Sequence, residues 1–198
     1  MVNASNCDEQ DIRDMERLVA GHDAALNDLM SRHAEKLFHY LVRSLQDESD
    51  AEDLTQETFV KIYQNRTRFD PKQKFSTWLY AIASNLVRDH YRWRSRHPQV
   101  SLEAEDQHTE TNLKDTLRAS EPTPDQNLQE HERAVAVRHA VAQLPEELKQ
   151  PLILALYQEL PQAEIATILK CSTKAVETRI YRARQQLRTK LAQLLQTL

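Results

Sequence analysis

The 198-residue chain contains a single glycine, Gly21. Tight β-turns, glycine-rich phosphate loops and Rossmann-type nucleotide sites need positive φ angles or a close backbone approach, which glycine permits most easily. The near absence of glycine therefore argues against a turn-rich sheet and against nucleotide-dependent chemistry. Leu, Ala, Gln, Glu and Arg, which are good helix formers, dominate instead. Together these features predict an all-α protein.

The charged residues are arranged in blocks of opposite sign, although the formal net charge is only -4. Residues 47–57 hold six acidic side chains and no basic one, whereas eight Arg or Lys in 66–96 face two acids. Nine acids face two bases in 98–132, and seven bases face one acid in 170–190. We interpret this alternation as different surfaces offered to different partners.

Cysteine usage and hydropathy indicate a soluble intracellular protein. Cys7 and Cys171 are far apart, so we read neither a disulfide framework nor a metal-ligand spacing, and we expect no metal and no cofactor. The segment Asn3–Asp11 is polar, and the longest apolar run, Leu152–Tyr157, is too short to span a membrane. The expected location is the cytoplasm.

Apolar periodicity predicts two helices at the N-terminal end of the chain. Asp11–Ala20 reads as a short helix that Gly21 ends, and Asp23 is the expected cap of the next helix. His33 falls on the apolar stripe of that second helix, and we expect it to be packed because no ligand-spaced partner accompanies it. The stripe consists of Leu26, Leu29, Met30, His33, Leu37, Leu41 and Leu45.

Two further helices complete the first predicted unit. Asp50 is expected to open a helix to about Asn65, and Ser76 to cap one that runs to about Arg94. The first of these should bury Ala51, Leu54, Thr58, Phe59 and Ile62. After His97 come about 30 polar, acidic, weakly periodic residues that are typical of a linker. This linker is either a solvated tether or an electrostatic shield for basic surfaces.

The second unit contains a helix-turn-helix pattern. A helix ends at Leu144, and another should run from about Glu146 to Leu160. The segment PQAEIATILKCSTKAVETRI at 161–180 then predicts a short helix to Leu169, a turn, and a long helix capped by Ser172. Lys170 stands where many such turns have glycine, so it must adopt or avoid a left-handed conformation.

The last helix carries a basic face beyond this turn. Arginine can read guanine edges bidentately and can also neutralise phosphate, so this helix could both specify and position DNA. A solvated basic face is the alternative, but the capped two-helix pattern directly upstream favours DNA contact. The candidate residues are Lys174, Thr178, Arg179, Arg182, Arg184 and Arg188.

Residues 69–93 combine six of the twelve aromatic residues with the first basic block. Aromatic faces stack on exposed bases while arginines hold the backbone, so the combination suits single-stranded nucleic acid. Trp78, Ile82 and Leu86 fall at four-residue steps, however, and are expected in the core. The better candidates for nucleic-acid contact are Asn85, Arg88, Arg92 and the loop from Arg66 to Phe75.

Two segments resemble a known family. DAEDLTQETFVKIYQ at 50–64 and FSTWLYAIASNLVRDHYR at 75–92 are similar to region 2 of extracytoplasmic-function (ECF) sigma factors, a group of the sigma-70 family. LPEELKQPLILALYQELPQAEIATILKCSTKAVETRIYRARQQLRTKL at 144–191 is similar to their region 4. The resemblance implies a region 2 helical domain at 1–97, a flexible acidic linker at 98–127 and a region 4 helix-turn-helix domain at 128–198.

The resemblance also implies functions for these surfaces. The acidic helix would bind the clamp helices of the largest subunit of RNA polymerase through Asp50, Asp53, Gln56, Glu57 and Lys61. Promoter melting and capture of a flipped -10 base would involve Arg66, Arg68, Lys72, Lys74, Phe75, Asn85, Arg88 and Arg92. Region 4 would lie at the polymerase flap and read duplex -35 DNA through Ser172, Thr173, Lys174, Thr178, Arg179, Arg182, Arg184 and Arg188. An anti-sigma factor commonly holds such proteins inactive.

Two other functions fit parts of the sequence. A dimeric helix-turn-helix regulator with an N-terminal sensor domain would explain 161–190 but would leave the basic and aromatic cluster at 66–96 without a role, and it would need a two-fold axis for its half-sites. A small hydrolase using Asp, Glu and His would need spaced catalytic groups, whereas the eight histidines are scattered. We therefore expect a non-enzymatic transcription initiation factor.

Overall fold

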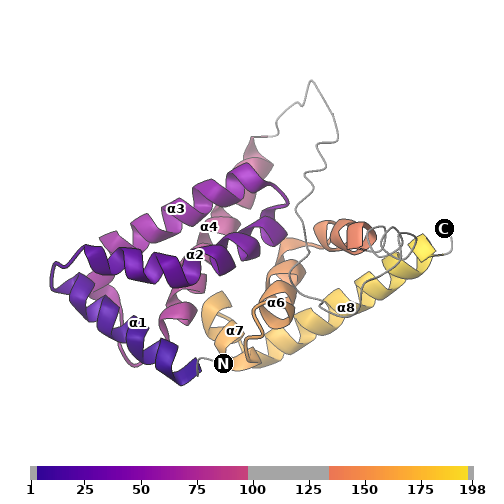
Figure 1. Cartoon of the computed structure of the whole chain (residues 1–198). Coiled ribbons are helices and arrows are strands. Elements are labelled where there is room, and N and C mark those ends of the chain that lie inside the picture. Colours follow the sequence, from indigo (N-terminus) through magenta and orange to yellow (C-terminus); the bar gives the residue numbers. More distant parts are fainter. Residues whose placement is uncertain (1–3, 98–133, 196–198) are drawn as a thin grey trace, which may run out of the picture.

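The computed structural model describes residues 4–97 and 134–195, and all regular structure in these two stretches is helical (Figure 1). The all-α prediction is thereby confirmed. The N-terminal part contains α1 (Ala4–Val19), α2 (Ala24–Leu45), α3 (Glu48–Gln64), the 3-10 turn η1 (Arg66–Arg68) and α4 (Phe75–Arg96). The C-terminal part contains a helix at 134–142, α6 (Glu146–Leu156), α7 (Gln162–Leu169) and α8 (Thr173–Leu195). The predicted linker and the predicted start of the second domain at Leu128 lie outside the described residues.

The turn between α1 and α2 follows the glycine signal. Gly21 has φ 93°, and the His22 amide donates to the Arg17 carbonyl at 3.0 Å, which closes the end of α1. Two details of the prediction were wrong. Helix α1 begins at Ala4, seven residues before Asp11. Asp23 makes no capping hydrogen bond because its backbone is already helical, with φ -59° and ψ -26°.

Helices α1, α2, α3 and α4 enclose the N-terminal core. The five residues expected on the inner face of α3 are all buried. The cap of α3 is Asp47, not Asp50: Asp47 is extended and its carboxylate accepts a hydrogen bond from the Asp50 amide at 2.9 Å. Ser76 does not cap α4 either. The helix begins one residue earlier, at Phe75. The ring of Phe75 is fully buried, so burial of this apolar side chain, and not a capping hydrogen bond, fixes the start of the helix.

The C-terminal helices form the predicted helix-turn-helix. Lys170 adopts the left-handed conformation with φ 52°, and the Ser172 hydroxyl caps α8 by accepting a hydrogen bond from the Ala175 amide at 3.1 Å. Helix α6 ends at Leu156, four residues earlier than expected. A left-handed residue at Glu159 and a hydrogen bond from the Leu160 amide to the Leu154 carbonyl turn the chain toward α7 there.

The two helical parts pack directly against each other. Helices α6 and α7 contact α2 and α4, and buried side chains from both parts belong to one apolar cluster. The Tyr80 hydroxyl donates to the Gln158 side-chain carbonyl, and Lys74 Nζ lies 2.7 Å from Glu164 Oε1. The Arg43 guanidinium lies 4.3 Å from the centre of the ring of Tyr157, a second contact of α2 with the C-terminal part. Within 4–97 and 134–195, no helix is long and apolar enough to cross a membrane.

Candidate polymerase and promoter interfaces

The outer face of α3 is acidic and exposed. Burial of Leu54, Thr58 and Phe59 turns the side chains of Asp53, Gln56 and Glu57 to solvent. Val60 follows at helical spacing on the same side and is 51% exposed, an apolar side chain that the sequence interpretation missed. Glu57 also pairs with Lys61 at 3.3 Å.

Asp50 differs from the other residues predicted for this face. Its carboxylate lies 3.3 Å from His90 Nε2 on α4, so it faces the neighbouring helix. An open groove adjoins the exposed acids between α2 and α3. It is lined by Ala34, Glu35, Phe38, Glu52, Thr55 and Gln56. Acidic side chains around a partly apolar groove can receive a partner helix that carries basic residues.

The loop between α3 and α4 rests on an aromatic cluster. The ring centroid of Phe69 lies 6.2 Å from that of Phe75 and 5.3 Å from that of Trp78. Phe75 is fully buried, which corrects the expectation that this residue contacts DNA: a ring with no exposed surface cannot stack on a base. In the sequence, Phe75 belongs to a group of aromatic residues that resembled a surface for stacking on bases. In the structure, its ring packs against Phe69 and Trp78 beneath the loop.

The cations of this loop are held differently from one another. Arg66 is partly buried, donates to the Tyr63 carbonyl at 2.8 Å and lies with its guanidinium 4.4 Å from the centre of the Tyr63 ring. Arg68 and Lys72 are exposed, and no residue in the described ranges pairs with their side chains. Lys74 is occupied by Glu164 from α7. Arg68 and Lys72 are therefore the cations of this loop that are free to meet phosphate.

The remaining -10 candidates are spread along α4. Asn85 is half-buried and its side-chain carbonyl accepts from Arg88 at 3.4 Å, whereas Arg92 is exposed beside Asp89 at 3.5 Å. At 1.5 Å per residue, Asn85 lies about 15 Å and Arg92 about 25 Å along the axis from Phe75. The structure therefore separates the predicted residues into a loop group and an α4 group. Trp93, one of the six aromatic residues of the cluster at 69–93, is 47% exposed, although it was not among the preferred candidates for nucleic-acid contact.

The beginning of α6 lies near the arginines of α4. Burial raises the pKa of Glu146, while the charges of Arg88, Arg92 and Lys149 act in the opposite direction. Burial also lowers the pKa of Lys149, whose ammonium donates to the Tyr91 hydroxyl at 3.2 Å. Part of the predicted -10 surface is thus adjacent to a carboxylate of the C-terminal part.

Helix α8 presents the predicted basic surface. Thr173 and Lys174 occupy its first turn beside the Ser172 cap, and Thr178 donates to the Lys174 carbonyl at 2.9 Å. Lys174 pairs with Glu177 at 2.7 Å. Tyr181 is 63% exposed on this surface and was missed. The arginines without a side-chain partner in the described part of the chain are Arg179, Arg182, Arg184 and Arg188.

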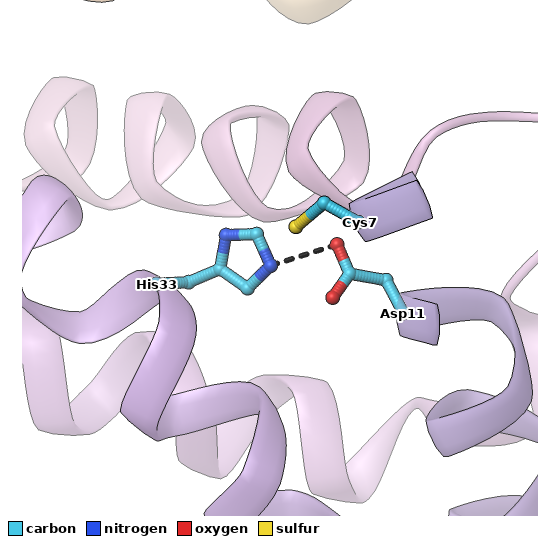
Figure 2. Close-up of side chains that lie close together, drawn as sticks. All are labelled: Cys7, Asp11 and His33. Atoms are coloured by element: carbon cyan, nitrogen blue, oxygen red, sulfur yellow. Dashed lines mark hydrogen bonds and ion pairs between the residues drawn. The ribbon is translucent and has the colours of Figure 1, made fainter. Parts of the chain in front are cut away.

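His33 is packed in the core, as predicted, but it has partners that the sequence did not reveal. Its Nε2 lies 2.8 Å from Asp11 Oδ2, and Cys7 lies beside both residues (Figure 2). Burial, followed by the charge of Asp11, raises the pKa of the Cys7 thiol. A thiol in this environment is not an activated nucleophile.

Comparison with known proteins identifies the class of protein that these surfaces define. The family described as sigma-70 region 2 matches residues 29–97, and the family described as sigma-70 region 4 matches residues 134–187. The chain is therefore a sigma factor, a protein that binds core RNA polymerase and directs promoter-specific initiation of transcription. A dimeric helix-turn-helix regulator does not account for the region 2 match.

Curated relatives define the subfamily. The chain is 33% identical to RNA polymerase sigma-H factor of Pseudomonas aeruginosa over 94% of this chain and 96% of that protein. It is also 33% identical to the ECF RNA polymerase sigma factor SigW of Bacillus subtilis, over 88% of this chain and 92% of that protein. The chain belongs to the extracytoplasmic-function sigma factors.

Solved structures of similar proteins share the fold. CnrH in complex with the cytosolic domain of CnrY matches with a TM-score of 0.67 and 25% identity, over 92% of this chain and 97% of that one. The sigma factor RpoE of Bartonella quintana, in complex with the anti-sigma factor NepR, matches with a TM-score of 0.64 and 20% identity, over 84% of this chain and 96% of that one.

Proposed function

We propose that three surfaces of this chain divide the work of promoter recognition: the outer face of α3 binds core polymerase, the loop at 66–74 with α4 engages the -10 element, and α8 reads the -35 element. The observation that carries this proposal is the capped α8 with four unpaired arginines, in a chain whose α3 offers an exposed acidic face. The protein acts in the cytoplasm as a non-enzymatic factor, with domains at 1–97 and 128–198 joined by the acidic linker 98–127.

The α3 face suits a basic partner helix. Asp53, Gln56 and Glu57 point outward beside the groove, while Val60 adds an apolar contact that water-exposed charges alone would not provide. Interfaces of this kind gain specificity from charge and affinity from buried apolar area. Asp50 and Lys61 lie at the edges of the face, where each already has an intramolecular partner.

The -10 surface combines a partly buried amide with free cations. Asn85 can donate and accept hydrogen bonds at the edge of a base extruded from the duplex, while Arg68 and Lys72 hold the backbone. Arg88 positions Asn85 through their shared hydrogen bond. The exposed Trp93, whose ring stacks on that of His97 at 5.0 Å, could stack on a further base.

Asn85→Ala should impair promoter opening more than formation of the closed complex, because only opening requires a flipped base. Permanganate footprinting of the -10 region should show the loss of reactive thymines, while binding to duplex promoter stays within about twofold. Asp89→Ala, an exposed change one turn away on the same helix, is the matched control and should open normally. Normal opening by Asn85→Ala would move base capture to another part of the protein.

The -35 surface lies at the N-terminal half of α8. In a helix-turn-helix the early residues of the second helix reach base edges, whereas later residues meet phosphates. Lys174, Thr178 and Arg179 lie within the first two turns. Arg188 lies about 14 Å farther along the axis than Arg179 at 1.5 Å per residue.

Arg179→Ala should cost about 1 to 3 kcal/mol of binding free energy on the cognate -35 element and flatten discrimination among base substitutions. Arg188→Ala should weaken binding to all -35 sequences by the same factor and reduce the slope of log affinity against log salt by about one unit. The measurement is binding of the reconstituted holoenzyme to a panel of -35 variants at several salt concentrations. If Arg179→Ala lowered the affinity for all -35 variants equally while Arg188→Ala changed the base preference, α8 would lie in the DNA groove in a different register.

The two domains must separate when both promoter elements are bound. Elements centred at -10 and -35 are roughly 25 base pairs apart, which is about 85 Å of B-form DNA at 3.4 Å per base pair. Here α7 packs on α4, and Lys74 of the -10 loop is paired with Glu164. The packed arrangement therefore represents a state of the factor that cannot engage both elements.

An anti-sigma factor is a natural partner for this packed state. The solved structure of CnrH, to which the chain is similar across both domains, holds CnrH in complex with the cytosolic domain of CnrY, and that of RpoE holds RpoE in complex with the anti-sigma factor NepR. A partner that binds only the packed arrangement would shift the population away from the promoter-competent state by its differential affinity. We therefore place this chain under the control of an anti-sigma protein that contacts both domains.

A further inference from the structure

We propose that Cys7, Asp11 and His33 form a binding site for a divalent transition metal, with Zn²⁺ as the ion that best fits the donors. Cys7 and Asp11 lie one turn apart on the same side of α1, and His33 faces them from α2 (Figure 2). One ligand atom from each residue lies within 4.8 Å of the others. Among residues 4–97 and 134–195, this is the one group of three or more such side chains close enough to share an ion.

The donor set selects the class of metal. A thiolate sulfur, an imidazole nitrogen and a carboxylate oxygen are the three ligand types that Zn²⁺ takes, whereas Mg²⁺ and Ca²⁺ prefer oxygen alone. Zn–S bonds of ~2.3 Å and Zn–N bonds of ~2.0 to 2.1 Å place the ligands of a tetrahedral site about 3.3 to 3.8 Å apart. The observed spacing is within reach of that geometry by side-chain rotation. Three protein ligands leave a fourth position for water.

Neighbouring side chains already hold two of the three proposed ligands in place. Asp11 is 1% exposed, and its Oδ1 accepts from Arg32 Nε at 2.9 Å, which orients the carboxylate so that Oδ2 faces His33 Nε2 at 2.8 Å. A bound ion would replace this direct Asp11–His33 hydrogen bond, and the two atoms would move apart to the ligand spacing. Fixing the ligands through second partners of this kind is how proteins orient metal sites. The His33 ring is itself packed against Phe75, with ring centroids 5.0 Å apart.

The charges around the cluster balance when a divalent ion is bound. The Arg32 guanidinium is shared with Asp14, whose Oδ2 lies 2.6 Å from Nη2. Asp14 also pairs with Arg17 at 2.9 Å, but Arg17 has a second carboxylate partner in Asp28 at 3.3 Å. Asp14 and Asp28 together therefore offset Arg32 and Arg17, which leaves Asp11 and the Cys7 thiolate to neutralise the two positive charges of the metal. Cys7 is only partly buried, so an ion can enter from that side.

The position of the site gives bound metal a consequence for the -10 surface. His33 lies against Phe75, the first residue of α4, and α1 also contacts the η1 turn of the same loop. An ion that joins α1 to α2 would thus stiffen the support beneath the loop at 66–74. This effect on promoter opening rests on the proposed function, whereas metal binding itself does not.

The test is titration of the full-length reduced protein with Co²⁺, whose thiolate charge-transfer and tetrahedral ligand-field absorption bands report its ligands, followed by displacement with Zn²⁺. We expect one equivalent of Co²⁺ to bind with both bands, and Zn²⁺ to remove them and raise the melting temperature. Cys7→Ala should abolish the charge-transfer band and weaken binding at least about tenfold. Cys171→Ala is the matched control and should leave the spectrum unchanged.

A wild-type protein without the charge-transfer band, or a band that persists in Cys7→Ala, would overturn the proposal. Because His33→Gln could disturb the core, Cys7→Ala at the partly exposed thiol carries the test, with far-ultraviolet circular dichroism as the check on folding. If Cys7→Ala lost metal binding but transcribed normally, only the proposed effect of the metal on promoter opening would be wrong. Normal metal binding by a protein inactive in transcription would leave the site intact and contradict the proposed function instead.

Discussion

Replacement of Asp53 and Glu57 together by arginine is expected to weaken binding to core RNA polymerase by at least about 100-fold. Both carboxylates are exposed on the outer face of α3, beside the groove shared with α2. The change replaces attraction to a basic partner by like-charge repulsion, which costs several kcal/mol at an interface, and each 1.4 kcal/mol is tenfold in affinity. Fluorescence anisotropy of the labelled factor with purified core would measure the loss.

A matched variant separates docking from net charge. Glu9 and Glu16 are exposed on α1, so Glu9→Arg with Glu16→Arg changes the net charge of the chain by the same amount on another surface. This control should bind core within about threefold of wild type. Exposed charges contribute little to folding, so both double variants should melt as cooperatively as wild type. Equal losses in the two variants would remove α3 as the docking face.

Phe75→Ala is expected to destabilise the N-terminal domain by about 3 to 5 kcal/mol, as typical for truncation of a buried phenylalanine. The ring is fully buried and contacts the rings of His33, Phe69 and Trp78. Its loss would leave a cavity beneath the -10 loop. Urea denaturation followed by circular dichroism would measure the change, and the slope with denaturant should stay near that of wild type.

Phe75→Leu tests whether the ring acts through packing. Leucine keeps much of the buried apolar volume, so this variant should lose less than about 1.5 kcal/mol and should open promoters nearly normally below its melting temperature. If the ring stacked on a DNA base, both variants would lack that contact and both would be defective in promoter opening. Defective opening by a well-folded Phe75→Leu protein would therefore restore the direct role that the structure removes.

The helices and the inner face of α3 could be predicted because they depend on local periodicity. The three-to-four-residue spacing of Ala51, Leu54, Thr58 and Ile62 places them on one face of the helix, so they can be buried together in only one orientation. Val60 could have been found by the same arithmetic, since it follows Gln56 by four residues on the outer face. The first residues of helices were harder to predict from the sequence. Helix α4 begins at Phe75 because this ring is buried in the core, and Ser76 provides no cap there.

Contacts between distant residues could not be predicted from the sequence. His33 meets Asp11 across 22 residues and Cys7 across 26, and their proximity exists only once α1 has folded back on α2. The packing of α7 on α4 likewise could not be predicted, because the apolar pattern of each helix does not indicate which distant helix it will contact. The candidate -10 residues were predicted as one patch, but the rise of α4 spreads them over a length that a list of basic and aromatic residues does not reveal.

Run-off transcription with purified core polymerase and a library of genomic fragments tests the central claim most directly. The full-length chain should direct core to a small set of discrete start sites that core alone does not use. The fragments should share -35 and -10 elements, and the Asp53→Arg, Glu57→Arg variant should produce none of these transcripts. Discrete transcripts that persist undiminished in that variant, or none at all from a wild-type protein that binds core, would contradict the account.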